Sequence, residues 1–475
     1  MNSRLKSFFH DYWCVAIIIL ITPLLLFATI QILPTHDDWF GATKPDFDPF
    51  FIKERFLFYG YHWRPFDTWI GYIVGRNPQL LFPAFNHICV VVGHVLCSFL
   101  IYRLLRLLQF DKFACNISTL YFFITPSAMA TLFAVDSQNQ VYSLVWGILA
   151  FFLYIHLKTS KYIIWFITIF IAALCKENGL MWALICPILA FGFDLIDKKT
   201  LKKDILIGLS IMLSYALAVF LLPKDVVIHP EYIPDTVKVI KNIIKFLVIS
   251  FVTFDYVYIL HQQHRNLLVG GLLFVITLPF LYFLFINIIK TIKEKRVICV
   301  IICLLIAAAP HLLTIYSMMH VYAGLLFITI LIAYSVNKYG NNIKYVFASF
   351  VLFIIAAFTI DSHLWYESNE SGLTGKRMSQ EAISKTGCPT DSIFSIVIND
   401  DYQRLSSFCV APQEAFGWSF ATQYETNYQW PNHIYELTID MKEEKKIDSI
   451  ITRAQKKGYH TFWIVRKDGV TVLKY

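Results

Sequence analysis

The sequence has few charged residues, and this scarcity excludes most classes of soluble protein. Charged residues make up 16% of the 475-residue chain and hydrophobic residues 57%, whereas soluble domains carry about 25% charged residues. Residues 14–33 carry no charge at all, and a helix of this length crosses about 30 Å of hydrocarbon. Similar runs recur near residues 86–101, 114–134, 141–157, 162–175, 180–193, 205–222, 267–289, 297–317, 321–336 and 344–360. These runs predict an α-helical polytopic membrane protein with about eleven transmembrane helices.

Metal-binding and repeat patterns are also missing. None of the 10 cysteines stands in a C-x-x-C pair, the spacing typical of zinc and redox sites. Most of them lie in the apolar runs, where cysteine acts as a small apolar residue. Only Cys388 and Cys409 follow the last apolar run, and we expect them to form a disulfide because that region is predicted to lie outside the cytoplasm. The alternative is that both are buried free thiols.

Short basic loops alternate with less basic ones, and this alternation predicts the orientation in the membrane. The basic loops are YRLLRLLQFDK, KTSK, DKKTLKKD, KTIKEKR and NKYGNNIK. They account for much of the net charge of +8, so this charge does not indicate a nucleic-acid partner. The N-terminus, with Arg4 and Lys6 before a first span that is retained rather than cleaved, is then cytoplasmic. The first long loop, residues 34–85, faces outward.

Residues 243–260 form one more apolar stretch, but they fit this topology only if they do not span the membrane. A span here would move the basic loop 290–296 to the outer face. The stretch also contains Asp255 and is flanked by lysines and Arg265. We therefore expect an interfacial or re-entrant segment on the outer face.

The composition becomes polar after the last apolar run. Two later segments have the pattern of strands and one has helical spacing; they are residues 392–399, 460–467 and 443–459. We therefore predict two domains, a transmembrane domain of residues 1–361 and a small extracytoplasmic α/β domain of residues 362–475.

The first outer loop places two acids, Asp37 and Asp38, directly after the first span. A loop as long as residues 34–85 is typically functional, and its aromatic content favours amphipathic helices on the membrane surface. At this water-accessible edge, next to apolar surface, a carboxylate can take a proton from a hydroxyl group. The alternative is that the acids only cap a surface helix, since aspartate is common there.

Two motifs supply positive charge. In HWRPF, Trp63 and Pro65 flank Arg64, whose guanidinium can bind phosphate through two parallel bonds. The alternative for this motif is an anchor at the membrane interface. In LCKENGLMW, Lys176 and Glu177 stand between two apolar runs, where a charged pair is costly unless it has a function.

Further polar residues fall at the predicted outer ends of spans. His87 and His94 in NHICVVVGH favour structural hydrogen bonds inside the bundle. Asp136 and Asn139 in AVDSQNQ could bind sugar hydroxyls or cap helices. The late motif HLLTIYSMMHVYAGLL adds His311 and His320. Because all these features share one face, we predict one outward-facing site, suited to deprotonating a hydroxyl while a phosphate leaves.

The order of these motifs resembles the GT-C superfamily of polytopic glycosyltransferases. Within it, the nearest likeness is to the protein O-mannosyltransferase group, including the tetratricopeptide-containing transmembrane O-mannosyltransferases. The matching elements, spread over residues 10–335, are the Asp37–Asp38 pair, WRPF, NHICVVVGH, CKENGL, FDYVYIL and MHVYAG. In the last of these, His320 stands where that group has arginine. A small α/β region replaces the tetratricopeptide tail, so protein mannosylation does not carry over.

The resemblance implies a GT-C-like enzyme that takes a hexose or pentose from a polyprenyl-phosphate carrier. It would pass the sugar, with inversion, to a hydroxyl of a surface glycan, a glycolipid or a protein. Asp37 or Asp38 would be the general base, and Glu177 would orient Lys176. The donor phosphate would be held by Arg64, Lys176 and His320, with support from Trp63, His87, Asp136, Asn139 and Asp255.

The resemblance leaves open whether a divalent metal, Mg²⁺ or Mn²⁺, takes part. It implies a bacterial inner-membrane protein that contacts membrane lipids. One alternative is an O-antigen polymerase or ligase, but those enzymes place their long loop late in the chain and this sequence places it first. Another is a transporter, which usually shows inverted repeats and mid-membrane charges; no internal repeat is visible here.

Overall fold

The structure is a computed structural model, and it describes most of the chain. The described residues are 11–35, 38–39, 64–65, 70, 73–158, 160–221, 236–252, 267–311, 318–340, 342–387, 392–399, 421, 424–426 and 434–475. Asp37, Trp63, Asp255, Cys388 and Cys409 lie outside these residues. The predicted disulfide therefore stays a prediction.

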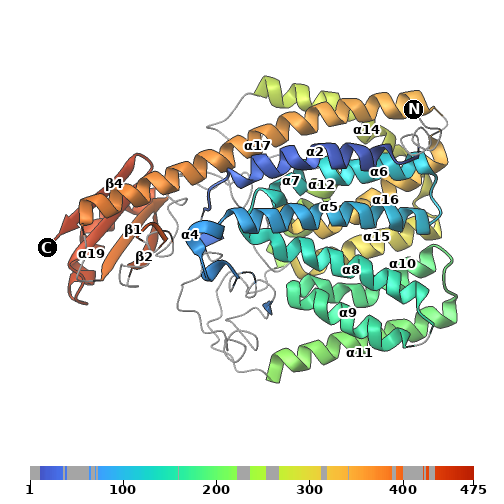
Figure 1. Ribbon diagram of the computed structural model, residues 1–475, viewed down its shortest axis with the longest axis horizontal. Coiled ribbons are helices and arrows are strands. Elements are labelled where there is room, and N and C mark those ends of the chain that lie inside the picture. Colours follow the sequence, from blue (N-terminus) through green and yellow to red (C-terminus); the bar gives the residue numbers. More distant parts are fainter. Residues whose placement is uncertain are drawn as a thin grey trace.

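The chain forms a bundle of helices that run side by side, with a small sheet domain beyond one end of it (Figure 1). The bundle contains α2 (Trp13–Ile30), α5 (Ala84–Leu107), α6 (Lys112–Ile124), α7 (Pro126–Leu132), α8 (Gln138–His156), α9 (Lys161–Cys175), α10 (Trp182–Gly192), α11 (Lys198–Leu221), α12 (Thr236–Val252), α14 (Leu267–Thr291), α15 (Lys295–Ala308), α16 (Tyr322–Tyr339) and α17 (Ile343–Thr386). A short helix, α4 (Pro78–Leu81), lies at the end that faces the sheet domain (Figure 1). We call this end the domain end of the bundle and the opposite one the far end.

Among the described residues, 6 helices are long and apolar enough to cross a membrane. The number becomes 7 if α6 and α7, which are bent by 48°, count as one broken span. The break falls at Pro126, because proline opens α7 and biases the preceding Thr125 to the extended conformation that it adopts. The predicted helical membrane protein is thus confirmed, while the count of about eleven spans stays a prediction.

The exposed faces of the long helices carry large apolar side chains, as contact with lipid requires. On α11, Leu213, Leu217 and Phe220 are largely exposed, although apolar groups of this size are usually buried in a soluble protein. They therefore form a lipid-facing surface. The opposite side of the same helix contributes Asp204, Ile211 and Tyr215 to the interior.

A buried carboxylate joins three helices near the far end. Asp204 of α11 is fully buried and accepts hydrogen bonds from the hydroxyl groups of Tyr154 on α8 and Tyr162 on α9. The ammonium group of Lys161 lies 3.7 Å from the same carboxylate. A buried charge is tolerated only when it is paired and hydrogen-bonded in this way.

We expect Asp204→Asn to destabilise the bundle by about 2 kcal/mol, because one tyrosine hydroxyl and Lys161 lose their carboxylate partner. Thermal unfolding in detergent should show a clearly lower Tm. Asp194→Asn is the matched control: Asp194 also pairs with a lysine, at 2.7 Å, but its side chain is 62% exposed, so its Tm should hardly change. Equal Tm values for the two variants would contradict the structural role of Asp204.

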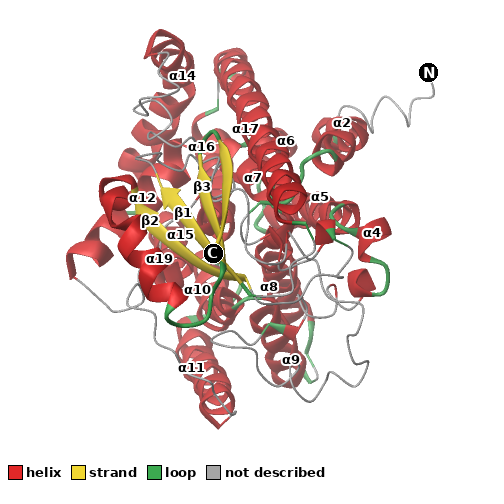
Figure 2. Cartoon of the chain, turned by 90° about the vertical axis from the view of Figure 1, so that its left-hand side faces the viewer, coloured by secondary structure: helices red, strands yellow, loops and turns green. Residues whose placement is uncertain are grey.

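The sheet domain has 4 strands in the order β2-β1-β3-β4. The strands are β1 (Ile393–Asn399), β2 (Ile434–Asp440), β3 (Thr461–Arg466) and β4 (Gly469–Lys474). β1 is parallel to both β2 and β3, and β4 returns antiparallel to β3. The end of α17 packs through Met378 and Ala382 on one face, and α19 (Ile447–Gln455) covers the other (Figure 2). The predicted small α/β domain is confirmed.

The bundle and the sheet domain are joined by one unbroken helix. α17 extends for 44 residues from Ile343 to Thr386, so the predicted boundary at residues 361–362 falls inside it. Its first half is apolar, and its second half buries small residues such as Ser371, Gly372 and Gly375. The change of composition therefore does not coincide with a break in the backbone.

The apolar stretch at 243–260 is described only as far as the end of α12. Phe246 of this helix is buried against Gly324 of α16, where even a methyl group would come within 2.6 Å of its ring. Gly324 lies in the first turn of α16, and α12 also contacts the turn before it, η7 (Met318–Val321). α12 is therefore anchored near the domain end of the bundle. Its interfacial or re-entrant character stays a prediction.

Candidate functional site

Most of the predicted site residues that the structure describes meet at the domain end of the bundle. They come from the segment after α2, from Arg64, from the turn η3 (Val135–Ser137) with the start of α8, and from the turn η4 (Glu177–Met181) after α9. The late turns η6 (Ala309–His311) and η7 add two histidines. Residues far apart in the sequence are thus brought to one place.

Asp38 fixes the turn that follows the first helix. Its Oδ2 accepts a hydrogen bond from the backbone N–H of Thr35 at 3.1 Å, and its Oδ1 accepts one from the backbone N–H of Asp136 at 3.1 Å. Asp38 is only 1% exposed. The expectation of a water-accessible carboxylate is therefore wrong for Asp38, because its two oxygens are enclosed and bonded by the backbone of Thr35 and of Asp136 in η3.

A short polar chain leads from this turn to Lys176. The side-chain amide of Asn139 donates to the backbone carbonyl of Asp136 at 2.9 Å. The carbonyl oxygen of the same side chain accepts from Nζ of Lys176 at 3.4 Å. Lys176 is 7% exposed, so its charge lies in a largely dehydrated place where it interacts strongly with an anion.

Arg64 is held by Glu177. Its Nε lies 3.0 Å from Oε1 and its Nη2 lies 2.8 Å from Oε2, which makes a bidentate pair with a fixed plane. Both side chains are partly exposed. Lys176 contacts Asn139 and the carboxylate of Glu177 pairs with Arg64, so the prediction that Glu177 orients Lys176 stays a prediction.

Gly179 allows the turn η4 to lie directly on the end of α9. A Cβ at this position would come within 2.3 Å of the backbone carbonyl oxygen of Ala172. That same oxygen accepts the backbone N–H of Lys176, and the carbonyl of Lys176 accepts the N–H of Gly179 at 2.8 Å. The glycine of the CKENGL motif therefore sets the positions of Lys176 and Glu177.

We expect Gly179→Ala to lower both Tm and activity, because overpacking against backbone costs about 1–3 kcal/mol and must displace η4. Gly271→Ala on α14 is the control, since nothing lies within 4 Å of a Cβ there and alanine is the better helix former. Thermal unfolding and the transfer assay described below measure both effects. Unchanged Tm and activity in Gly179→Ala would contradict the role assigned to Gly179, because η4 would then tolerate displacement.

Two stacked histidines lie beside the cations. The rings of His311 and His320 are 4.7 Å apart between centroids and 22° from parallel. His311 is only 4% exposed, and Lys176, Glu177 and Arg64 are its charged neighbours.

The histidines of NHICVVVGH have structural contacts. Nε2 of His87 lies 3.1 Å from the backbone carbonyl oxygen of Ile32, which fixes the chain that leads to Asp38. His94 is bonded to the hydroxyl of Tyr322 at 2.7 Å and to the carbonyl oxygen of Phe123 at 3.1 Å. Both are fully buried. His87 therefore contributes to the site by fixing the backbone at Ile32.

An apolar cavity of about 310 Å³ has Asn139 in its lining. The other lining residues are Ile70, Leu96, Gln138, Tyr142, Val145, Trp146, Leu149 and Cys175, mostly from α8. Because Asn139 also contacts Lys176, the cavity adjoins a cation. An apolar lining next to a cation suits a ligand with an anionic head and a hydrocarbon tail.

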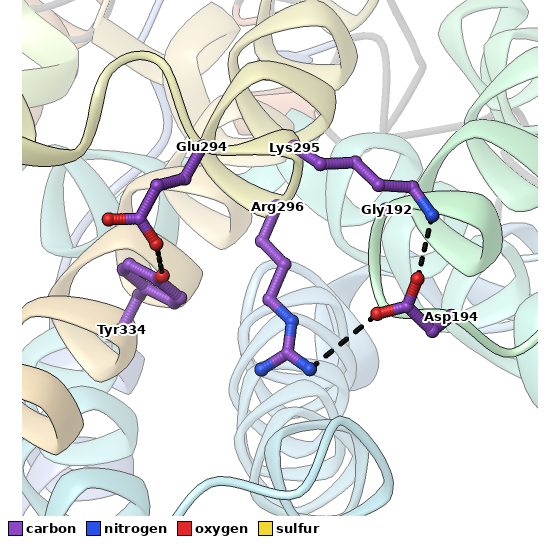
Figure 3. A pocket seen from close by; sticks show the side chains of 6 residues that line it. All are labelled: Gly192, Asp194, Glu294, Lys295, Arg296 and Tyr334. Carbon is purple, nitrogen blue, oxygen red and sulfur yellow. Dashed lines mark hydrogen bonds and ion pairs between the residues drawn. The ribbon is translucent and has the colours of Figure 1, made fainter.

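A second cavity, of about 410 Å³, lies at the far end of the bundle (Figure 3). Its charged groups have partners in the cavity lining. Lys295 and Arg296 form ion pairs with Asp194, and Glu294 accepts a hydrogen bond from the hydroxyl group of Tyr334. None of the residues of the candidate site lines it. We therefore assign its charges to holding the loop ends and not to the site.

Sequence reasoning missed a cluster that packs beside Asp38. It is formed by Trp39, Val74, Phe82, Val135 and Ala421, with Tyr424 packed against it. In the sequence the one sign of this cluster is Trp39, the aromatic residue after the acid pair. Tyr424 gives no sign of it, because it lies hundreds of positions away. Within the described part of the chain, no group of three or more His, Cys, Asp or Glu side chains is placed to hold a metal ion.

Comparisons with known proteins agree with this architecture. No protein-family model and no curated protein sequence matches the chain. The structure is similar to that of ArnT from Cupriavidus metallidurans bound to undecaprenyl phosphate, with a TM-score of 0.53 and 11% identity over 97% of each chain. The expected GT-C-like fold is thus confirmed. Weaker similarity, with a TM-score of 0.46 and 13% identity, extends to the oligosaccharyltransferase AglB from Archaeoglobus fulgidus, over 96% of this chain and 70% of that one.

Proposed function

We propose that this protein is a membrane glycosyltransferase that moves a sugar from a polyprenyl-phosphate donor to a hydroxyl group at the outer face of the membrane. The observation that carries the proposal is the contact of Lys176 with Asn139, a residue that lines an apolar cavity, together with the pairing of Arg64 to the adjacent Glu177. A polyprenyl phosphate needs both features, a cation for its head and a hydrocarbon-like space for its tail. ArnT, whose fold this chain shares, holds undecaprenyl phosphate in its crystal structure.

In this proposal the departing phosphate is stabilised by fixed positive charge. Lys176 is nearly buried and Arg64 is held in one plane by Glu177, so neither group has to reorganise as charge develops on the leaving oxygen. His320, stacked on His311, adds a ring nitrogen that can hydrogen-bond to the phosphate. The apolar cavity keeps the prenyl chain out of water.

The acceptor hydroxyl is deprotonated by an acid of the first loop. Both oxygens of Asp38 accept backbone N–H groups, and such bonds favour the ionised form and weaken a carboxylate as a base. We therefore assign the general base to Asp37 and a positioning role to Asp38. Direct attack of the hydroxyl on the anomeric carbon then inverts its configuration. The proposal includes no metal-dependent step.

Transfer of label from a defined donor tests the proposal. Purified protein in liposomes receives polyprenyl phosphate carrying a radiolabelled hexose or pentose, together with envelope glycolipids as acceptors. We expect release of polyprenyl phosphate and labelled product. A polyprenyl-diphosphate oligosaccharide serves as the test of the polymerase or ligase alternative. Consumption of that donor alone, or movement of intact donor across the bilayer without cleavage, would contradict the proposal.

A further inference from the structure

The long connection between β1 and β2 returns from the sheet domain to the bundle. β1 ends at Asn399 and β2 begins at Ile434, and Ala421 and Tyr424 lie between them. Ala421 is fully buried. Ala421 belongs to the buried cluster that includes Trp39 and Phe82 at the domain end of the bundle, and Tyr424 packs against this cluster. The sheet domain therefore contributes side chains to the immediate surroundings of the candidate site.

Three aromatic rings form what we call the aromatic clamp: Trp39, Phe82 and Tyr424. The distances between ring centroids are 5.6 Å for Trp39 and Tyr424, 5.7 Å for Phe82 and Tyr424, and 5.8 Å for Trp39 and Phe82. These separations and the tilted ring planes are favourable for aromatic pairs. Each ring contacts the other two, so loss of one leaves the remaining pair underpacked.

Tyr424 is also held by two hydrogen bonds to the segment before α5. The side-chain amide of Gln79 donates to its backbone carbonyl at 2.8 Å. Its hydroxyl donates to the backbone carbonyl of Phe82 at 3.3 Å. The bonds fix the backbone and the ring of Tyr424 independently, so its position is specified more tightly than packing alone would require.

The clamp lies directly beside the bond between Asp38 and Asp136. Trp39 follows Asp38 in the same turn, and Val135, which belongs to the same buried cluster, precedes Asp136. The bonded pair is thus flanked on both sides by residues that the clamp packs. Trp39 is 4% exposed and Val135 is 1% exposed, which leaves little room for the turn to move while Tyr424 is in place.

We propose that Tyr424 is a positioning residue, through which the sheet domain holds Asp38, with its bonds to Thr35 and Asp136, in its working geometry. The inference rests on the proposed function for its effect on catalysis. Removal of the ring frees Trp39 to move and loosens the bonds of the adjacent Asp38. Because a displacement of about 1 Å at a reacting group can cost up to about 10² in rate, partial loosening should lower kcat about tenfold.

The test compares Tyr424→Ala with Tyr424→Phe and with Tyr435→Ala in the full-length protein. Tyr435 is the control because it lies on β2 of the same domain, is 52% exposed and stacks only within that domain. Hydrogen exchange, read by mass spectrometry, follows the backbone N–H groups of Asp38 and Asp136. The transfer assay gives kcat and the KM for the donor.

We expect faster exchange at Asp38 and Asp136 in Tyr424→Ala, with kcat about tenfold lower and an unchanged donor KM. Tyr424→Phe keeps the ring contacts and should recover most of the rate, and Tyr435→Ala should behave as the wild type. Unchanged exchange in Tyr424→Ala, or an equal loss in Tyr435→Ala, would overturn the inference. If Tyr424→Ala does not fold, Gln79→Ala, which removes one of the two bonds, replaces it. A wild-type protein without transfer activity refutes the proposed function, and the exchange data then decide the role of the clamp separately.

Discussion

Asp37→Asn should lower the rate of sugar transfer by about 10²-fold or more, the usual contribution of a general base. Asparagine has nearly the same size but cannot accept the proton of the acceptor hydroxyl. The variant should insert and fold normally, because the change removes a charge without adding bulk. The measurement is kcat in the transfer assay, with Tm in detergent as the check on folding.

Asp38→Asn gives the comparison that separates the two acids. Asp38 accepts backbone N–H groups of Thr35 and Asp136 through its two oxygens, and an amide nitrogen in place of one oxygen cannot accept. We therefore expect a lower Tm as well as lower activity. Near-normal turnover of Asp37→Asn, with the large loss confined to Asp38→Asn, would remove the base from Asp37.

Arg64→Ala should lower kcat/KM for the donor about 30-fold, because a charge-assisted bond to phosphate contributes about 2 kcal/mol. Arg64→Lys keeps the charge but loses the planar fork, so it should recover only part of this loss. Glu177→Gln removes the charge that fixes the guanidinium at 2.8 Å and should have a smaller effect in the same direction. Normal donor use by Arg64→Ala would leave Arg64 as an interface anchor.

The helical membrane bundle was predictable because each long apolar run carries its own signal. The runs at 14–33 and 205–222 became α2 and α11 with shifts of a few residues. α17 was not predictable as one helix, because its composition changes near residue 361 while its backbone does not. Helical periodicity continues beyond that point through small residues such as Gly372 and Gly375, which is a weaker signal than the loss of hydrophobicity.

The residues of the candidate site were predictable singly, whereas their pairing was not. Arg64 and Glu177 are 113 positions apart, and each stands in a motif that gives no information about the other. The nearest charged neighbour of Glu177 in the sequence is Lys176, and nothing local points to the distant Arg64. In the folded chain Glu177 lies in η4, which packs on the end of α9 at Gly179, and spacing alone does not reveal this backbone contact.

The burial of Asp38 was not predictable either, because it also depends on contacts between residues far apart in the sequence. Its position after an apolar span indicates an edge next to water, and the sequence contains nothing to say that η3 will bond to it. Trp39 and Val135, which flank the bonded pair, share one buried cluster with Ala421, more than 280 positions away from either. Long-range contacts of this kind decide whether an acid is exposed, and they are absent from any local pattern.

The position of the donor phosphate tests the central claim most directly. The measurement is an experimental structure of the full-length protein in lipid, determined with a polyprenyl phosphate bound. The account predicts that the phosphate lies between Arg64 and Lys176, within hydrogen-bonding distance of both, with the prenyl chain in the cavity lined by Tyr142 and Trp146. A phosphate bound in the far-end cavity beside Arg296, with the site at Arg64 and Lys176 empty, would contradict it.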